Sequence, residues 1–481
     1  MIFNSLTYLT LLFTVVILYW VLPYRSRLIL ILTASLTFYG FWRVEFLPVM
    51  LISVVADYFV ALKMPQASHR LKKKLLLTSL IVNLGLLFYF KYLIFFAENA
   101  IGLSNLMGVE IDPLALNIIL PLGISFYTFQ TISYTVDVYR GLIKPEKDFV
   151  LFACYVTFFP QLVAGPVLRS IEVIHQFAKR PPFLWSDIVI GIRRILYGLF
   201  LKVVLADNIA PIVDTGYSMP LDAMSALDVW TLAFLFGFQI YFDFSAYSHI
   251  ALGSARLMGI KFPENFNFPY LATSPKDFWR RWHISLSSWI RDYLYLPLSG
   301  IKVQRVRSTG GLSDATLKRK NIVLLSTWAI MGLWHGANWV FILWGLYHAI
   351  VIIVYRLLLP LINSFSNNIK MIGGIFFTLP IMMLSWIPFR SESLDMAISM
   401  WAKVFNPYLY DSLGMRENAY LVTAVILVGV VAVYWIKHQL IPSLDPKGYL
   451  LVLGEVATFT IMFSLVIVFF RPINQFIYFQ F

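Results

Sequence analysis

The chain has 481 residues, of which 59% are hydrophobic and only 13% are charged. Soluble domains carry about 25% charged residues, so this composition excludes a large soluble domain and indicates a polytopic membrane protein. The net charge of +13 is expected of basic cytoplasmic loops and does not indicate nucleic-acid binding. The single cysteine, Cys154, excludes an internal disulfide and a multi-cysteine metal site.

The N-terminal half alternates apolar stretches with charged loops. The first twenty residues lack a basic n-region and a small-residue cleavage site, so we expect a retained first span over residues 6–22. Further spans are predicted over 27–42, 44–62, 75–96, 116–138 and 195–205. Asp57 interrupts one of them and is expected to pair inside the bundle. The basic loop 63–74 is predicted to be cytoplasmic, and the acidic loops 97–112 and 206–228 to be external. Residues 149–167 contain Pro160, Gly165 and Pro166, which favours a re-entrant or kinked segment.

A polar region follows the span predicted over 229–257. Residues 274–300 begin Ser-Pro-Lys-Asp, which is typical of a helix start with proline just inside it. Apolar and basic residues then alternate as in an amphipathic helix. We therefore expect a helix that lies in the inner interface or dips partway into the membrane. The loop 302–320 carries six basic residues and one acidic residue, which predicts a cytoplasmic position.

Residues 321–355 contain no Asp, Glu, Lys or Arg, although His335 lies within them. The segments before and after this stretch are both predicted to lie on the cytoplasmic side. The stretch must therefore enter and leave the membrane on that same side. We therefore expect a helical hairpin with its turn near residues 336–338. An ionisable side chain at membrane depth is costly and indicates a functional site.

Three later spans, 371–388, 419–436 and 449–470, bring the total to about ten to twelve plus re-entrant helices.

Three motifs together resemble those of one family. They are Phe-Trp-Arg-Arg-Trp-His-Ile-Ser-Leu-Ser at 278–287, Gly-Leu-Trp-His-Gly-Ala-Asn-Trp at 332–339 and Phe-Pro-Gln-Leu-Val-Ala-Gly-Pro at 159–166. They resemble the membrane-bound O-acyltransferases (MBOAT), and most closely the bacterial alginate O-acetyltransferase (AlgI-like) subgroup. The resemblance implies an all-α polytopic helical bundle around a central tunnel, as a single domain over residues 1–481.

The resemblance also implies an activity, an acyltransferase of class EC 2.3.1.- in the bacterial inner membrane. Acetyl groups would pass from a cytoplasmic thioester, acetyl-CoA, to an extracytoplasmic polysaccharide such as an alginate-like polymer or peptidoglycan. An SGNH-type or AlgJ/AlgX-like acetyltransferase would be the partner, with no tightly bound cofactor. Three alternatives stay open: D-alanyl transfer to teichoic acid (DltB-like), a transporter or flippase with broken helices, and a structural subunit of a polysaccharide synthase.

Acyl transfer from a thioester to a hydroxyl needs a base and stabilisation of the developing oxyanion. His335 is the candidate base, because a buried imidazole tends to stay neutral. The resemblance implies that His283 lies in the same chamber and orients the acyl carbonyl. No metal site is expected, since the deep segment offers no carboxylate. His348 is as well explained by packing.

Further site residues fall into two sets. Asn338 either donates a hydrogen bond to the reacting groups or caps the helix that follows it. The residues expected to line the substrate tunnel are Trp334, Asn338, Trp282, Ser285 and Asp292. The basic loop suits the phosphates of coenzyme A, although ordinary positive-inside charge explains it equally well. Its candidate residues are Lys302, Arg305, Arg307, Lys318, Arg319 and Lys320.

Overall fold

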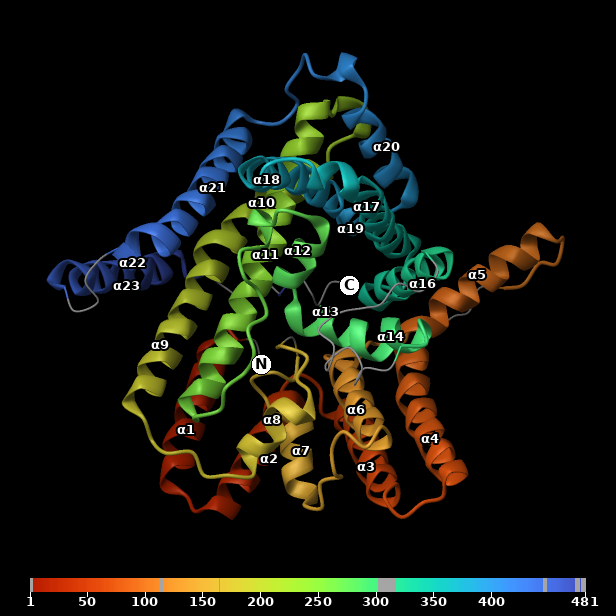
Figure 1. Ribbon diagram of the computed structural model, residues 1–481, viewed down its shortest axis with the longest axis vertical. Coiled ribbons are helices and arrows are strands. Elements are labelled where there is room, and N and C mark those ends of the chain that lie inside the picture. The colour runs from red at the N-terminus through yellow and green to blue at the C-terminus, as the bar shows by residue number, and fades with distance from the viewer. Residues whose placement is uncertain are drawn as a thin grey trace. The chain divides into compact units, whose positions relative to one another are not determined.

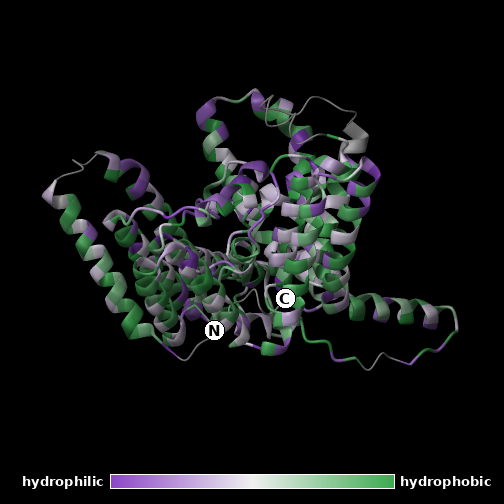
Figure 2. Cartoon of the chain, turned by 90° about the horizontal axis from the view of Figure 1, so that it is seen from below, coloured by the Kyte–Doolittle hydropathy of each residue, from purple (hydrophilic) through white to green (hydrophobic). Residues whose placement is uncertain are grey.

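The computed structural model describes residues 3–112, 116–163, 165–301, 317–443, 448–471 and 476. Every regular element in these residues is a helix (Figure 1). Seven of the described helical segments are long and apolar enough to cross a membrane, and the long helices are coloured mostly as hydrophobic in Figure 2. They are Val44–Lys63, His69–Leu106, Ala226–Leu257, Trp339–Asn363, Asn367–Arg390, Glu417–Leu440 and Leu451–Phe469. The predicted all-α, multi-pass membrane protein is confirmed, whereas the total of ten to twelve spans and the central tunnel stay predictions.

The chain divides into two compact units. The first comprises Met1–Ile195 and Tyr247–Pro263, and the second comprises Leu196–Ala246 and Glu264–Phe481. The single domain over residues 1–481 stays a prediction. The helices that begin in the first unit are α1 (Leu6–Val21), α2 (Tyr24–Gly40), α3 (Leu47–Lys63), α4 (His69–Leu87), α5 (Leu93–Leu106), α6 (Ile124–Tyr139), α7 (Phe149–Thr157), α8 (Ser170–Phe177) and α9 (Trp185–Leu199).

A buried carboxylate joins three helices of the first unit. Asp57 on α3 is fully buried and accepts hydrogen bonds from Asn83 Nδ2 on α4 at 2.7 Å and from Thr135 Oγ1 on α6 at 3.1 Å. Ser79 on α4 donates another hydrogen bond to the same carboxylate. A carboxylate at membrane depth is tolerated where its oxygens are paired. The expected pairing of Asp57 inside the bundle is thus confirmed, and it fixes α3 against α4 and α6.

Several predicted boundaries are wrong. A π-helical turn carries α4 on into α5, so helix occupies much of the loop predicted over 97–112. The helix predicted from residue 116 begins only at Ile124, because Pro121 and the left-handed Gly123 (φ 73°) precede it. Helix α10 (Asp207–Tyr217) occupies half of the loop predicted over 206–228. The short α7, which ends at Thr157, agrees with the broken segment expected over 149–167.

The second unit contains the remaining helices. They are α10, α11 (Ala226–Leu257, of which the part to Ala246 belongs to this unit), α12 (Pro275–Arg281), α13 (Ile284–Ile290), α14 (Leu296–Leu298), α16 (Leu317–His335), α17 (Trp339–Asn363), α18 (Asn367–Leu384), α19 (Trp386–Arg390), α20 (Leu394–Val404), α21 (Glu417–Trp435), α22 (Ile441–Ser443) and α23 (Tyr449–Phe469).

Helices α16 and α17 form the predicted hairpin, with residues 336–338 as its turn. A Cβ atom at Gly332 would lie 2.1 Å from the carbonyl oxygen of Phe341, and one at Gly345 would lie 2.1 Å from that of Trp328. Gly332 is opposite Phe341, whereas the earlier Trp328 is opposite the later Gly345, so the two helices are antiparallel. Small residues allow such close backbone approach between apolar helices. The two glycines therefore hold the end of α16, and with it His335, tightly against α17.

The amphipathic helix predicted over residues 274–300 is interrupted. Ser274 caps its start by accepting a hydrogen bond from the Asp277 N–H at 3.1 Å, as the Ser-Pro start predicts. The helix then breaks between α12 and α13, where His283 has left-handed backbone angles (φ 41°, ψ 54°). The Ile284 N–H, which a continuous helix would bond to its own preceding turn, donates instead to the Asn265 carbonyl at 2.9 Å. This break turns the His283 side chain out of the helical repeat.

Candidate functional site

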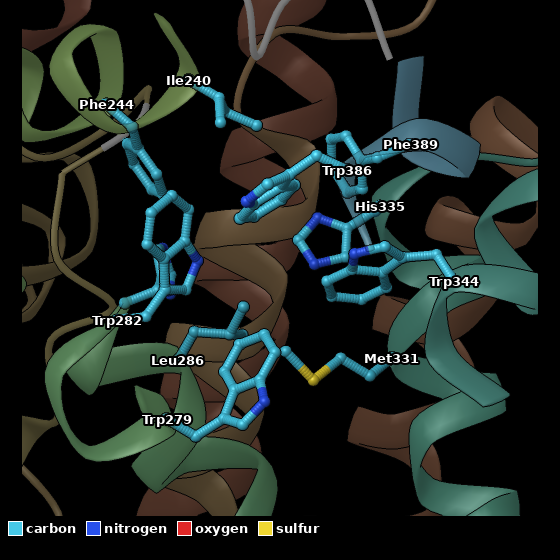
Figure 3. Close-up of a pocket in the computed structure, with 11 residues that line it drawn as sticks. Ile240, Phe244, Trp279, Trp282, Leu286, Met331, His335, Trp344, Trp386 and Phe389 are labelled. Carbon is cyan, nitrogen blue, oxygen red and sulfur yellow. The ribbon is translucent and has the colours of Figure 1, made fainter. Parts of the chain in front are cut away.

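A small cavity in the second unit contains both candidate histidines. It has about 10 Å³ of open space, and the side chains that surround it are shown in Figure 3. Two of its lining residues are histidines and the other nine are aromatic or aliphatic. The lining residues are Ile240, Phe244, Trp279, Trp282, His283, Leu286, Met331, His335, Trp344, Trp386 and Phe389. We call this space the histidine chamber.

Helical spacing brings these side chains together. Ile240 and Phe244 lie four residues apart on α11, and Met331 and His335 lie four apart on α16. Residues at this spacing share one face of a helix, so each helix presents a pair to the chamber. Two tryptophans and a phenylalanine from α17 and α19 enclose the space around His335 (Figure 3).

His335 is the last residue of α16 and is nearly buried, with 8% of its surface exposed. Its ring centroid lies 4.8 Å from that of Trp344, 4.9 Å from that of Trp334 and 5.2 Å from that of Phe389. All three rings meet the imidazole at steep angles. Aromatic rings on several sides restrict rotation of the imidazole and keep bulk water from it.

His283 faces the same chamber and is 1% exposed. Its ring lies 4.6 Å from the Phe244 ring, and neither ring nitrogen has a hydrogen-bond partner among the described residues. Burial lowers the pKa of His283 to about 3. The ring is therefore uncharged at neutral pH, with one N–H to donate and one nitrogen to accept. A buried polar side chain without a protein partner is suited to bind a substrate atom.

The backbone around His283 is fixed by Asn265, which is itself 1% exposed. The Asn265 carbonyl accepts from the Ile284 N–H at 2.9 Å. The Asn265 Oδ1 atom accepts from the Ser285 Oγ hydroxyl at 2.8 Å and from the Ser285 N–H at 3.3 Å. A non-glycine residue in the left-handed region persists only where its surroundings impose it. Asn265 provides this constraint, and the sequence carries no signal that singles it out.

A second, larger cavity adjoins the histidine chamber. It has about 350 Å³ of open space, and Trp279 and Met331 line both spaces. Three basic side chains line the larger space: Lys276, Arg291 and Arg356. We call it the basic cavity. Arg291 is oriented by Asp292, whose Oδ1 accepts a hydrogen bond from Arg291 Nε at 2.6 Å.

The structure separates the residues predicted to line the tunnel. Trp282 lines the histidine chamber, and Trp334 packs against the His335 ring without lining it. Ser285 bonds to Asn265, and Asp292 bonds to the Arg291 of the basic cavity. Asn338 caps α17, because its Oδ1 atom accepts a hydrogen bond from the Val340 N–H at 3.1 Å.

The predicted donor-binding residues cannot be placed. Lys302, Arg305 and Arg307 lie outside the described residues. The backbone of Lys318, Arg319 and Lys320 belongs to the first turn of α16, but their side chains lie outside the described part. The sequence does not single out, as donor-binding residues, the three basic residues that line the cavity beside the chamber: Lys276, Arg291 and Arg356.

His348 has a packing position. It is 1% exposed, and its ring lies 4.7 Å from the Trp344 ring and 4.9 Å from the Trp279 ring. It does not line either cavity. No cluster of three or more His, Cys, Asp or Glu residues with metal-binding geometry occurs in the described part of the chain.

Comparison with known proteins assigns the site to a family. A sequence model described as MBOAT, membrane-bound O-acyltransferase family, matches residues 3–389, which include both histidines. The chain belongs to the membrane-bound O-acyltransferase family. It is accordingly an acyltransferase of class EC 2.3.1.- and a multi-pass membrane protein.

Individual MBOAT relatives cover most of the chain. The chain is 38% identical to a probable alginate O-acetylase AlgI of Azotobacter vinelandii over 445 residues, which are 91% of this chain and 85% of the relative. It is 37% identical to a peptidoglycan O-acetyltransferase of Helicobacter pylori over 405 residues, or 79% and 73% of the two chains. A teichoic acid D-alanyltransferase of Bacillus subtilis is more distant, at 32% identity over 251 residues, or 50% and 60%.

Proposed function

We propose that this MBOAT protein is an O-acetyltransferase that moves an acetyl group from a cytoplasmic thioester to a hydroxyl group destined for an extracytoplasmic polysaccharide. The observation that carries the proposal is the pairing of His335 and His283 in one mostly apolar chamber that adjoins a larger basic cavity. The alginate and peptidoglycan O-acetylating relatives support a polysaccharide acceptor.

The donor is acetyl-CoA or an equivalent thioester. Pockets for cofactor-sized ligands are typically about 300 to 1,000 Å³, so the basic cavity, at about 350 Å³, has the size for a pantetheine arm. Its lysine and two arginines suit phosphate groups, which bind these side chains through charge-assisted hydrogen bonds. The thioester would then lie where the two cavities adjoin, beside Trp279 and Met331.

His335 acts as the general base in the proposed reaction. A ring nitrogen takes the proton of the acceptor hydroxyl as that oxygen attacks the thioester carbonyl carbon. A C–O bond forms and the carbonyl electrons move onto the carbonyl oxygen. When that intermediate collapses, the C–S bond breaks and the departing thiolate takes the proton back from His335. The products are an acetyl ester and a free thiol, and the imidazole is neutral again.

His283 stabilises the oxygen that becomes negative. Its uncharged ring has one N–H, which donates to the carbonyl oxygen of the thioester as charge develops there. The left-handed backbone imposed through Asn265 sets the direction of this donor. Removing one such donor typically costs about 10²- to 10³-fold in kcat.

The remaining component of the proposed reaction is the acceptor that carries the hydroxyl group. The hydroxyl belongs to a polysaccharide, or to an extracytoplasmic SGNH-type, AlgJ/AlgX-like acetyltransferase that passes the acetyl group on. The protein would lie in the bacterial inner membrane, with the thioester supplied from the cytoplasm. The acetyl group then crosses the membrane by transfer at His335.

Acetyl is favoured over D-alanyl by the chamber itself. A D-alanyl group carries an ammonium, and burying an ammonium without an anionic or hydrogen-bonding partner is costly. The described lining of the histidine chamber contains no carboxylate. The D-alanyltransferase relatives are also more distant than the O-acetyltransferases.

The test is acetyl transfer by purified protein in proteoliposomes, with [¹⁴C]acetyl-CoA and a soluble polysaccharide or partner acceptor. We expect transfer by the wild type and a loss of at least about 10²-fold in His335→Ala, the usual contribution of a general base. His438→Ala, which removes an exposed histidine, is the matched control and keeps wild-type activity. Wild-type transfer by His335→Ala would contradict the proposal. Movement of substrate across the vesicle without acetyl transfer would favour a transporter.

A further inference from the structure

We propose that Met331 and Trp279 form a size filter between the basic cavity and the histidine chamber, which restricts the transferred group to acetyl. This inference rests on the proposed function and specifies its substrate. Its starting observation is that these are the two residues common to the described linings of both spaces. A thioester that enters through the basic cavity must carry its acyl group past them to reach His335.

The two cavities differ greatly in size. The basic cavity has about 350 Å³ of open space and the histidine chamber about 10 Å³. The chamber therefore falls below the usual range of pockets for drug-sized ligands, which is about 300 to 1,000 Å³. Its walls are mostly bulky rings that pack against each other. The Trp282 ring lies 4.9 Å from the Trp386 ring, and the Trp344 ring lies 5.3 Å from the Phe389 ring. Little space remains for an acyl chain longer than acetyl.

Trp279 is the fixed side of the filter. It is 8% exposed, and its ring packs against Trp328 at 4.6 Å and against His348 at 4.9 Å. Trp344 also contacts His348, with ring centroids 4.7 Å apart, and the Trp344 and Trp279 rings lie 5.9 Å apart. The buried His348 therefore supports the wall between the cavities. This explains an intramembrane histidine that lines neither space.

Met331 is the adaptable side. Its side chain is 2% exposed and extends below His335 towards Trp279 (Figure 3). Methionine is unbranched and fills irregular gaps, so it can shift to admit a small group. Met331 lies one helical turn before His335 on α16, so an acyl group that passes Met331 arrives directly beside His335.

The experiment measures kcat/KM for acetyl-, propionyl- and butyryl-CoA with purified protein in proteoliposomes. A hydrophobic pocket discriminates one methylene group by about 10- to 200-fold, so we expect at least tenfold preference for acetyl over propionyl in the wild type. Met331→Ala removes one side of the filter, and we expect it to lower this preference about tenfold. Met331→Phe narrows the passage and lowers acetyl transfer.

The matched control is Leu324→Ala. Leu324 is buried and lies on α16 two turns before Met331. It lines the basic cavity but not the histidine chamber. If the filter lies at Met331, the Leu324→Ala variant keeps the wild-type preference for acetyl over propionyl. An unchanged acetyl-to-propionyl ratio in folded Met331→Ala, with acetyl transfer retained, would overturn the filter while the proposed function stands. A wild type that transfers no acyl group from any of the three thioesters would overturn both.

Discussion

His283 has unusual backbone angles for a non-glycine residue, and these angles aim an uncharged imidazole into the chamber. The motif containing His283 can be found from the sequence, because its residues match a motif of the MBOAT family. The backbone break at His283 cannot be predicted from the sequence. It depends on hydrogen bonds to Asn265, which lies about twenty residues earlier, and no local sequence pattern indicates these bonds.

Loss of the Asn265 side chain should therefore act through His283. In Asn265→Ala the buried N–H and hydroxyl of Ser285 lose their acceptor, which costs about 1 to 3 kcal/mol of stability. We expect kcat for acetyl transfer to fall about tenfold or more through misplacement of His283. Ser285→Ala, which loses only the hydroxyl bond, should lose less. Equal, wild-type kcat in both variants would contradict the positioning role.

His283 also makes a prediction about pH. Burial lowers its folded pKa to about 3, below the ordinary value of 6.5. The unfolded chain therefore binds an additional proton as the pH falls below 6.5, and this group lowers stability progressively down to about pH 3. In His283→Gln the melting temperature should fall less steeply between pH 6.5 and 4 than in the wild type. The pH profile of transfer between pH 6 and 8 should keep its shape while kcat falls, and a profile that lost an ionisation there would contradict an uncharged His283.

At the level of elements, the α16–α17 hairpin depends on two glycines. The sequence predicts the hairpin, because a charge-free stretch of this length must fold back between its flanking spans. It does not predict which residues set the interhelical distance. That distance is fixed by Gly332 and Gly345, where a side chain would meet the partner backbone at 2.1 Å.

Gly345→Ala should accordingly separate the two helices. Overpacking typically costs about 1 to 3 kcal/mol, and here it would also move His335 relative to Trp344. We expect a lower melting temperature and reduced transfer. Gly429→Ala on α21, where an added Cβ meets nothing within 4 Å, is the matched control and should keep both. Wild-type stability in Gly345→Ala would show that the hairpin is looser than described.

The basic cavity gives a prediction about the donor. Lys276, Arg291 and Arg356 come from three different elements, so no run of basic residues in the sequence reveals them. Arg356→Gln should raise the KM for acetyl-CoA about tenfold, since a charge-assisted contact contributes about 1.5 kcal/mol or more, and should change kcat little. Lys370→Gln, which removes a charge that lines neither cavity, should leave the KM unchanged. An unchanged KM in Arg356→Gln would place the donor phosphates elsewhere.

At the scale of the whole molecule, composition predicts the fold class and the motifs predict the family. The all-α membrane protein is confirmed by the described helices, and the family by a match over residues 3–389. The sequence does not show that the catalytic candidates share a chamber with Phe244 and Trp386. Those residues come from α11 and α19, and only the packed structure places them opposite the histidine motifs.

In the proposed reaction an acetyl group passes from a cytoplasmic thioester to an outer hydroxyl at His335. The most direct measurement supplies membrane-impermeant [¹⁴C]acetyl-CoA to one face at a time of oriented membrane vesicles and follows label on an acceptor at the opposite face. We expect labelled acceptor only when the donor is at the cytoplasmic face, and none above background in His335→Ala at equal protein level. Labelling by His335→Ala at the wild-type rate would contradict it.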